Sequence, residues 1–150
     1  MKANELMIGD WVLTLDSTHK EKVFAQVDAI EEGQHSILVT RECSNWFVDI
    51  DWIEPISLTS EILEKNGFIK KDDRLTDVYH LLVPTGFERS SFTIQVSLEP
   101  ICGVSTLVKC WGWLPPYNGG LNDIHLCSAN YAHQLQHALR LCGIEKEIIL

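Results

Sequence analysis

The chain alternates between hydrophobic and polar residues over many short runs, which is the pattern of β-strands that bury one face. The clearest run is Ser91 to Glu99, in which Phe92, Ile94, Val96 and Leu98 occupy every second position. Turn-forming residues bound the other runs. Together these runs predict strands at residues 8–15, 22–31, 36–41, 45–54, 78–83, 91–99, 104–114 and 124–127.

A first helix is predicted between Leu58 and Phe68. Thr59 is a suitable N-cap, because its hydroxyl can accept a hydrogen bond from a free backbone N–H of the first turn. Asn66 and Gly67 are suited to the end of the helix, where a left-handed residue is common. The segment is too short to be stable alone, so we expect it to connect two larger units by packing against them.

A second predicted helix, Ser128 to Ile144, has two different faces. At 100° per residue its apolar side chains form one stripe, with polar side chains opposite. The stripe consists of Tyr131, Ala132, Leu135, Ala138, Leu139 and Cys142, and the polar side of His133, Gln136, His137 and Arg140. Gly143 suits the position after the helix end. We therefore expect the stripe to pack on a core and the two histidines to face away from it.

The order of these elements predicts an α+β protein with two lobes. Residues 1–57 are expected to form a small bent β-sheet or an SH3-like barrel. Residues 58–150 are expected to form the connecting helix, an antiparallel sheet and a C-terminal helix that covers this sheet. The two lobes either stand apart or pack as one domain.

Charge is distributed unevenly along the chain. The formal net charge is −9; residues 1–64 hold 13 acidic and 4 basic residues, whereas residues 65–150 hold 8 of each. Proteins bind nucleic acid backbones by neutralising phosphates with Lys and Arg. The excess of acid therefore argues against direct nucleic acid binding, and it suits either a basic protein partner or a solvated surface.

The N-terminal sequence and the cysteines indicate the cytoplasm. Residues 1–11 contain charges and a turn where a signal peptide needs an apolar run, and no apolar run is long enough to cross a membrane. The number of cysteines is odd and no CxxC motif occurs. The simplest interpretation is five small buried side chains in a reducing compartment: Cys43, Cys102, Cys110, Cys127 and Cys142.

His133 and His137 have the H-x-x-x-H spacing with which one helix face can offer two imidazoles to zinc. A hydrolytic zinc site also needs a third ligand and a general base. Gln134 follows the first histidine and cannot act as a base. The third ligand would have to come from His80, Asp123 or His125. Surface or partner-contacting histidines are the simpler interpretation, so we expect neither a metal nor a cofactor.

Two further residue pairs are candidate reactive centres. Cys127 and His125 are two residues apart on a predicted strand, which places them on one face but too far apart for a dependable nucleophile–base hydrogen bond. Asp49 and Asp51 share a strand face and could bind a cation or act as a carboxylate pair. A packed cysteine and a solvated strand face are the simpler interpretations, so we expect no catalytic residues.

An aromatic stretch near residue 115 is a candidate contact surface. Trp111 and Trp113 lie on the same face of a predicted strand, and Tyr117 follows on a loop rich in proline and glycine. Tryptophan and tyrosine are favoured binding anchors, because they bury a large area with few torsions to freeze. The alternative is that both indoles lie in the core beneath the C-terminal helix. We take Trp111, Trp113 and Tyr117 as the predicted partner-binding residues.

Three motifs carry a resemblance to a known group: ELMIGDWV at 5–12, IEPISLTSEILEKNGF at 53–68 and YAHQLQHALRLCGIEKEI at 131–148. Together they resemble small uncharacterised proteins of Bacteroides-type gut bacteria and of their phages and mobile elements. That group has an IGD or IGN opening, an I-x-P-I-P-L-T helix start and a Y-V-H-x-L-Q helix. This chain departs from it at Ser57, where proline is favoured, and at His137, where asparagine is frequent. The resemblance implies no established activity.

These observations favour a cytoplasmic, non-enzymatic protein-interaction module without a membrane segment, and they leave a homo-oligomer open. The resemblance adds the context of a phage or mobile-element accessory. One alternative is a metal-dependent enzyme that uses His133 and His137. Another is an acidic inhibitor or nucleic-acid mimic that acts through its N-terminal lobe.

Overall fold

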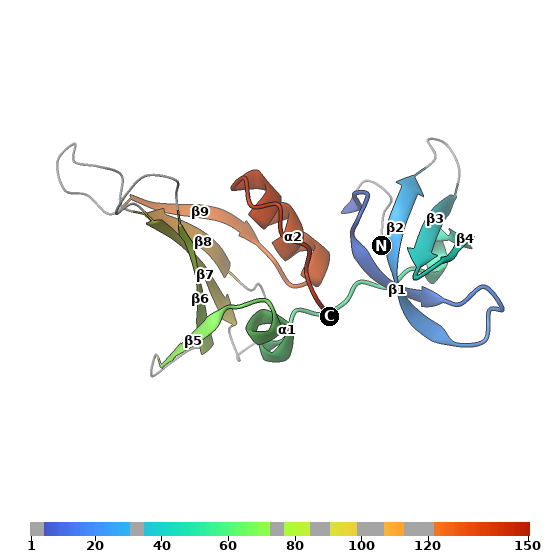
Figure 1. The fold of residues 1–150 in the computed structure, drawn as a ribbon, viewed down its shortest axis with the longest axis horizontal. Helices are drawn as coiled ribbons and strands as arrows, with labels where there is room; N and C mark the ends of the chain where they lie inside the picture. The colour runs from blue at the N-terminus through green and yellow to red at the C-terminus, as the bar shows by residue number, and fades with distance from the viewer. Residues whose placement is uncertain (1–4, 31–34, 73–76, 85–90, 99–106, 113–121) are drawn as a thin grey trace.

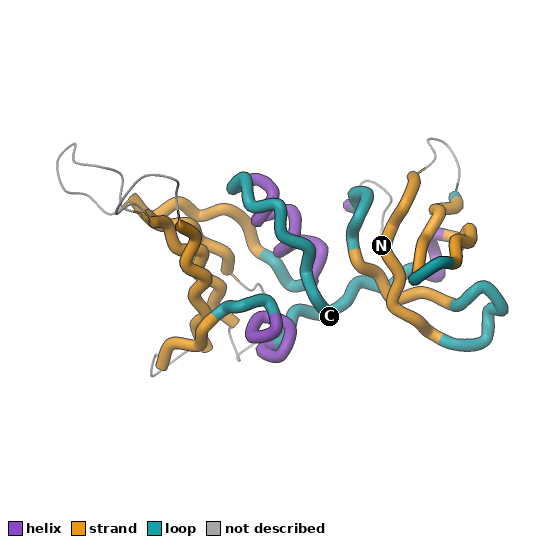
Figure 2. The backbone as a smooth tube through the Cα atoms, in the orientation of Figure 1, coloured by secondary structure: helices purple, strands orange, loops and turns teal. Residues whose placement is uncertain are grey.

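The chain forms an α+β fold of two antiparallel sheets with a helix between them (Figures 1 and 2). The computed structural model describes residues 5–30, 35–72, 77–84, 91–98, 107–112 and 122–150. One sheet lies at each end of an elongated molecule, and the C-terminus lies near its middle. The predicted α+β class is confirmed.

The first sheet contains four strands in sequential order, β1 (Trp11–Leu15), β2 (Lys22–Ile30), β3 (Ser36–Arg41) and β4 (Ser44–Asp49). Each strand pairs antiparallel with the next, and alternate side chains point to one face. That face forms a separate small core. Its buried members are Leu6, Val12, Ala25, Val27, Ile37, Val39, Val48 and Ile53.

The first sheet is open and bent, so the SH3-like barrel is not formed. The strand predicted over 45–54 ends at Asp49, because its carboxylate accepts a hydrogen bond from the Asp51 amide at 2.9 Å and caps a 3-10 turn at Ile50–Trp52. The chain then makes a single antiparallel bridge between Leu13 and Glu54. In the described ranges, no longer ladder closes the sheet.

Helix α1 (Ser60–Lys65) follows the prediction closely. The Thr59 hydroxyl accepts a hydrogen bond from the Ile62 amide at 3.3 Å. Gly67 ends the helix with a φ of 78°, and the Phe68 amide returns to the Leu63 carbonyl at 3.0 Å. This is the Schellman arrangement, which a residue with a Cβ adopts only with strain.

The second sheet contains five strands in sequential order, all antiparallel. They are β5 (Ile69–Asp72), β6 (Asp77–Pro84), β7 (Ser91–Leu98), β8 (Leu107–Gly112) and β9 (Asn122–Ser128). The sequence patterns predicted no strand at Ile69–Asp72. β5 accommodates charged residues because it is an edge strand of the sheet. The side chain of Lys70 is exposed to solvent there and forms an ion pair with Asp77 at 2.7 Å.

Helix α2 (Ala132–Leu141) lies between the two sheets (Figure 1). Its apolar stripe packs on the second sheet as predicted, in one core with Tyr79, Ile94 and Val96. The prediction for its polar side was wrong, because His133 is 2% and Gln136 1% exposed. That side faces the first sheet, which contacts the helix through β1. Helix α2 therefore has two interfaces, one with each sheet. The hydrophobic pattern of the sequence predicted only the interface with the second sheet.

The chain after α2 is fixed to α1 by the side chain of Asn66, which is fully buried. Its amide nitrogen donates to the Ile149 carbonyl at 2.8 Å, and its amide oxygen accepts from the Ile149 N–H at 2.9 Å. The same nitrogen also lies 2.8 Å from the Ile62 carbonyl. The Asn66 side chain thus satisfies the backbone N–H and carbonyl of Ile149, as a paired strand would. These hydrogen bonds hold the adjacent Ile148 in the core, where the Ile148 side chain is 1% exposed.

A pair of leucines in α2 tests this packing. Leu139 is 0% exposed and Leu141 is 80% exposed, so they share a residue type and a helix but not an environment. We expect Leu139→Ala to lower the free energy of unfolding by about 2–5 kcal/mol, the range for a buried leucine. Leu141→Ala should change it by less than about 0.5 kcal/mol. Urea denaturation measures both, and equal effects would contradict the packing described.

Candidate functional site

A turn before β1 places the carboxylate of Asp10 against α2. The Asp10 amide donates to the Met7 carbonyl at 3.1 Å, and Gly9 has a φ of 85°. The turn is anchored on β2, because Gly9 and Asp10 exchange two backbone hydrogen bonds with Val27, at 2.7 and 2.9 Å. As a result the side chain of Asp10 is 0% exposed.

Asp10, His137 and Arg140 form a charged cluster that we call the junction. His137 Nε2 lies 2.8 and 3.0 Å from the two carboxylate oxygens of Asp10, and Arg140 Nη1 lies 3.6 Å from one of them. The Met7 amide donates to the carboxylate at 2.7 Å. A buried carboxylate is tolerated when such partners compensate for lost hydration. The junction therefore ties the first lobe to the helix of the second.

Gly9 allows the junction to form at this distance. A Cβ at this position would lie 2.9 Å from Nη2 of Arg140, closer than real Cβ atoms come to another heavy atom. The positive φ is also strained for any residue with a Cβ. The turn therefore requires the glycine of the I-G-D motif, whereas an added Cβ would displace only the flexible end of the Arg140 side chain.

His133 lies beside the junction and is 2% exposed. Its ring stacks on Tyr131 with centroids 5.8 Å apart, and it meets the His137 ring edge-on at 5.8 Å. Its Nδ1 is buried without a hydrogen-bond partner. Burial lowers the pKa of His133 below the ordinary 6.5, an effect larger than the opposing influence of the Asp10 charge. The ring is therefore neutral at pH 7.

The two histidines considered as weak candidates for metal ligands have other contacts. His137 uses its Nε2 in the contact with the Asp10 carboxylate. His80 lies on β6, while Asp123 and His125 lie on β9 with side chains outside the described set. Among the described side chains, no group of three or more His, Cys, Asp or Glu is arranged to hold a metal ion. The geometry gives the histidines a role in joining the lobes.

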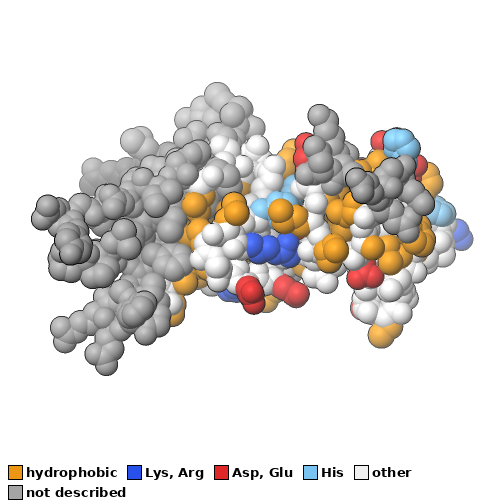
Figure 3. Space-filling model, turned by 90° about the horizontal axis from the view of Figure 1, so that it is seen from above, with side chains coloured by type: hydrophobic (Ala, Val, Ile, Leu, Met, Phe, Trp, Pro, Cys, Tyr) orange, Lys and Arg blue, Asp and Glu red, His pale blue; other side chains and the backbone are white. Residues whose placement is uncertain are grey.

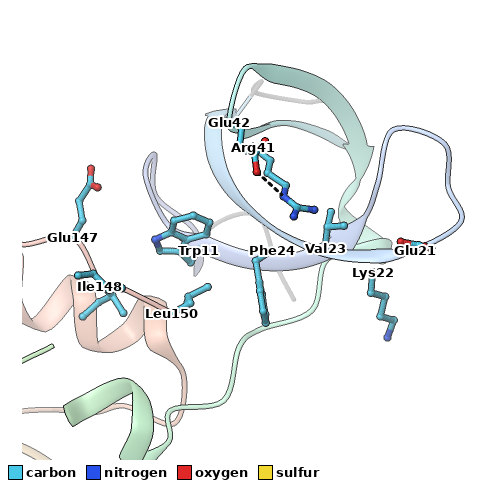
Figure 4. Close-up of a pocket in the computed structure, with 11 residues that line it drawn as sticks. Trp11, Glu21, Lys22, Val23, Phe24, Arg41, Glu42, Glu147, Ile148 and Leu150 are labelled. Atoms are coloured by element: carbon cyan, nitrogen blue, oxygen red, sulfur yellow. Dashed lines mark ion pairs between the residues drawn. The ribbon is translucent and has the colours of Figure 1, made fainter. Parts of the chain in front are cut away.

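A groove of about 660 Å³ lies between the first sheet and the C-terminal residues (Figure 4). Trp11 and Phe24 come from β1 and β2, and Ile148, Ile149 and Leu150 come from the opposite side. Phe24 is 47% and Ile149 58% exposed, so the groove offers apolar surface to solvent. Its volume is typical of a ligand or peptide site.

Charged side chains surround this apolar surface. Lys22 is paired with Glu54 at 2.6 Å, and Arg41 faces Glu42 at 4.0 Å. Glu21 and Glu147 also line the groove, and neither side chain has an ion-pair partner within the described chain. In Figure 4 these two glutamates lie at opposite ends, with Trp11, Leu150 and Phe24 between them.

The aromatic contact surface predicted near residue 115 stays a prediction. Trp111 lies on β8, where its backbone is paired with Thr93 and Asp123. Its side chain, together with Trp113 and Tyr117, lies outside the part of the chain that the structure describes.

The other residue pairs have limited chemical scope. Asp49 is used as the cap of the 3-10 turn, which removes it from a free carboxylate pair with Asp51. His125 and Cys127 both lie on β9, and neither side chain is among those described. Cys43 is an exposed thiol in the turn between β3 and β4, so the expectation that all cysteines are buried was wrong for this one.

Sequence reasoning missed Asp10, Arg140, Trp11 and Phe24 as site residues. A signal for the first two was present, because the I-G-D and H-x-L-Q motifs stand near opposite ends of the chain. In the structure the two motifs lie side by side, because Gln136 Nε2 donates to the Gly9 carbonyl at 3.4 Å. His137 follows Gln136 in the helix and contacts Asp10, which is 127 residues away in sequence. The two motifs are distant in sequence, and neither contains the full set of residues that a catalytic or metal site needs. A structural contact between them is therefore the interpretation that the sequence favours.

Comparisons with protein-family models, curated proteins and solved structures give no match for this chain. In the residues described, no helix has both the length and the apolar character needed to cross a membrane.

The junction can be tested with a double-mutant cycle. Asp10→Asn and His137→Ala should each lower the free energy of unfolding by about 1–3 kcal/mol, because each weakens the hydrogen bonding of the buried Asp10 position. The double variant should cost less than the two together, since both remove one interaction. His35→Ala, at an exposed position, is the control. Strict additivity would contradict a direct Asp10–His137 interaction.

The buried imidazole of His133 predicts a loss of stability in acid. Above about pH 6.5 both folded and unfolded chains hold it neutral; as pH falls, the unfolded chain takes up a proton first, because the folded pKa is lowered. The free energy of unfolding should therefore fall below about pH 6.5 and level off below the folded pKa. His133→Gln should weaken this dependence in urea titrations between about pH 8 and about pH 5. An unchanged dependence would refute the prediction.

Proposed function

We propose that the protein is a non-enzymatic interaction module that binds a partner protein in the groove between its lobes. The observation that carries this proposal is the pair of half-exposed apolar side chains, Phe24 and Ile149, that face one groove from two sides. Aromatic and large aliphatic side chains that are partly exposed in a concave site are characteristic of binding anchors.

The junction supports a structural rather than a catalytic role for the conspicuous histidines. A general base needs a free acceptor within reach of a substrate proton. At the junction, the Asp10 carboxylate already accepts from the Met7 amide and contacts His137 and Arg140. Asp10 is 0% and His133 2% exposed, which leaves little access for a substrate.

The fold offers a reason for such a junction in a binding module. The groove is formed by two separate parts of the chain, and its width depends on how the lobes are held. A junction that fixes the first sheet on α2 keeps both sides in place before a partner arrives. Preorganisation of this kind reduces the entropy lost on binding.

The context of a phage or mobile-element accessory is part of the proposal. It rests on the resemblance of the three motifs at 5–12, 53–68 and 131–148, which include the turn and the helix that meet at the junction. It makes the host cell the appropriate source in which to seek a partner.

The test is capture of partners from a host extract with the wild-type chain and with Phe24→Ala. We expect a partner held by the wild type to bind Phe24→Ala about 1–3 kcal/mol more weakly, the range of an aromatic anchor. Phe47→Ala is a matched control, because Phe47 is 55% exposed on the same sheet but does not line the groove. Thermal melting should be nearly unchanged in both.

A third variant, Tyr117→Ala, separates this groove from the aromatic stretch of Trp111, Trp113 and Tyr117. Loss of the captured partner with Tyr117→Ala and its retention with Phe24→Ala would place binding on the aromatic stretch instead. A partner that binds all three variants equally would contradict both surfaces.

A further inference from the structure

We infer that the groove takes a peptide segment of a partner that carries apolar side chains between two basic ones. The inference rests on the proposed function and adds the chemistry of the partner. It follows from the sequence of charges and apolar surface along the groove.

The two ends of the groove carry uncompensated negative charge. Glu21 and Glu147 line it from opposite ends and have no ion-pair partner within the described residues (Figure 4). The basic residues of the lining are already opposed, since Lys22 is bound to Glu54 and Arg41 faces Glu42. A ligand with a Lys or Arg near each end would neutralise the glutamates, whereas an acidic ligand would be repelled.

The middle of the groove is apolar. Phe24 and Leu150 lie between the two glutamates, with Trp11 beside them (Figure 4). Ile149 extends this surface and is 58% exposed. Apolar side chains of a bound segment would remove this area from water, which supplies the affinity that exposed charges alone do not.

The distribution of charge over the molecule agrees with a basic partner. The net charge of −9 arises in residues 1–64, which include all four strands of the first sheet on one side of the groove. Seen from above, the middle of the molecule carries both basic and acidic side chains, with hydrophobic side chains on either side (Figure 3). A basic segment that approaches the groove therefore meets a field of favourable sign.

The experiment selects random phage-displayed peptides against the full wild-type chain and, in parallel, against a Glu21→Lys/Glu147→Lys double variant. We expect wild-type selection to enrich apolar segments flanked by Lys or Arg, and the double variant to enrich apolar segments flanked by Asp or Glu. A synthetic peptide from the wild-type selection should bind each single reversal about 3- to 10-fold more weakly, and weaken further with added salt.

Two controls locate the binding. The selected peptide should lose affinity for Phe24→Ala and keep it for Phe47→Ala, and all variants should melt like the wild type. Enrichment of peptides that depend on Phe24 but lack flanking bases would overturn the inference and leave the proposed function intact. Failure to enrich any peptide that depends on Phe24 would also overturn it, while host-extract capture with Phe24→Ala still decides the proposed function separately.

Discussion

The relation between the two lobes depends on one buried carboxylate. Asp10 is fully buried, and a charge in that position is costly unless charged or strongly polar groups surround it. The Met7 amide belongs to its own turn, but His137 and Arg140 belong to the helix of the other lobe. The turn can therefore bury its acid only when the helix is docked. This requirement makes docking specific, because a different placement of the lobes would leave Asp10 without its counter-charges.

The geometry of the groove also depends on the docking of Asp10 against α2. Trp11 follows Asp10 directly on β1, so fixing the carboxylate on α2 also fixes the indole beside the C-terminal residues. On the other side, Asn66 holds Ile149 through two hydrogen bonds of its amide. Each side of the groove is thus fixed by one buried polar residue that is satisfied across a long sequence separation. The apolar surface between them remains exposed because both sides are held in place.

Local patterns predicted the parts of the fold that local interactions determine. The bounds of β3 and the capping of α1 follow from alternation and from Thr59 and Gly67, which act within a few residues. The end of β4 was missed, because a single side-chain cap at Asp49 competed with an otherwise regular alternation. The contact between His137 and Asp10 was missed for a different reason. Its partner lies 127 residues away, and hydrophobic periodicity carries no information about a polar contact at that distance. The groove was missed likewise, since it joins β1 and β2 to the chain end.

The sequence separation in the junction also has a consequence for synthesis on the ribosome. Asp10 is made 127 residues before His137, which at typical elongation rates of about 5–20 residues per second is a delay of roughly 6–25 s. Throughout that interval the first four strands can pair. The Asp10 carboxylate, however, lacks its contacts with His137 and Arg140 and must stay hydrated. The face of β1 that later meets α2 is therefore open on the nascent chain. All residues of the N-terminal lobe are thus synthesised long before the lobe can dock on α2. The exposed face of β1 is the surface on which a chaperone could act during that time.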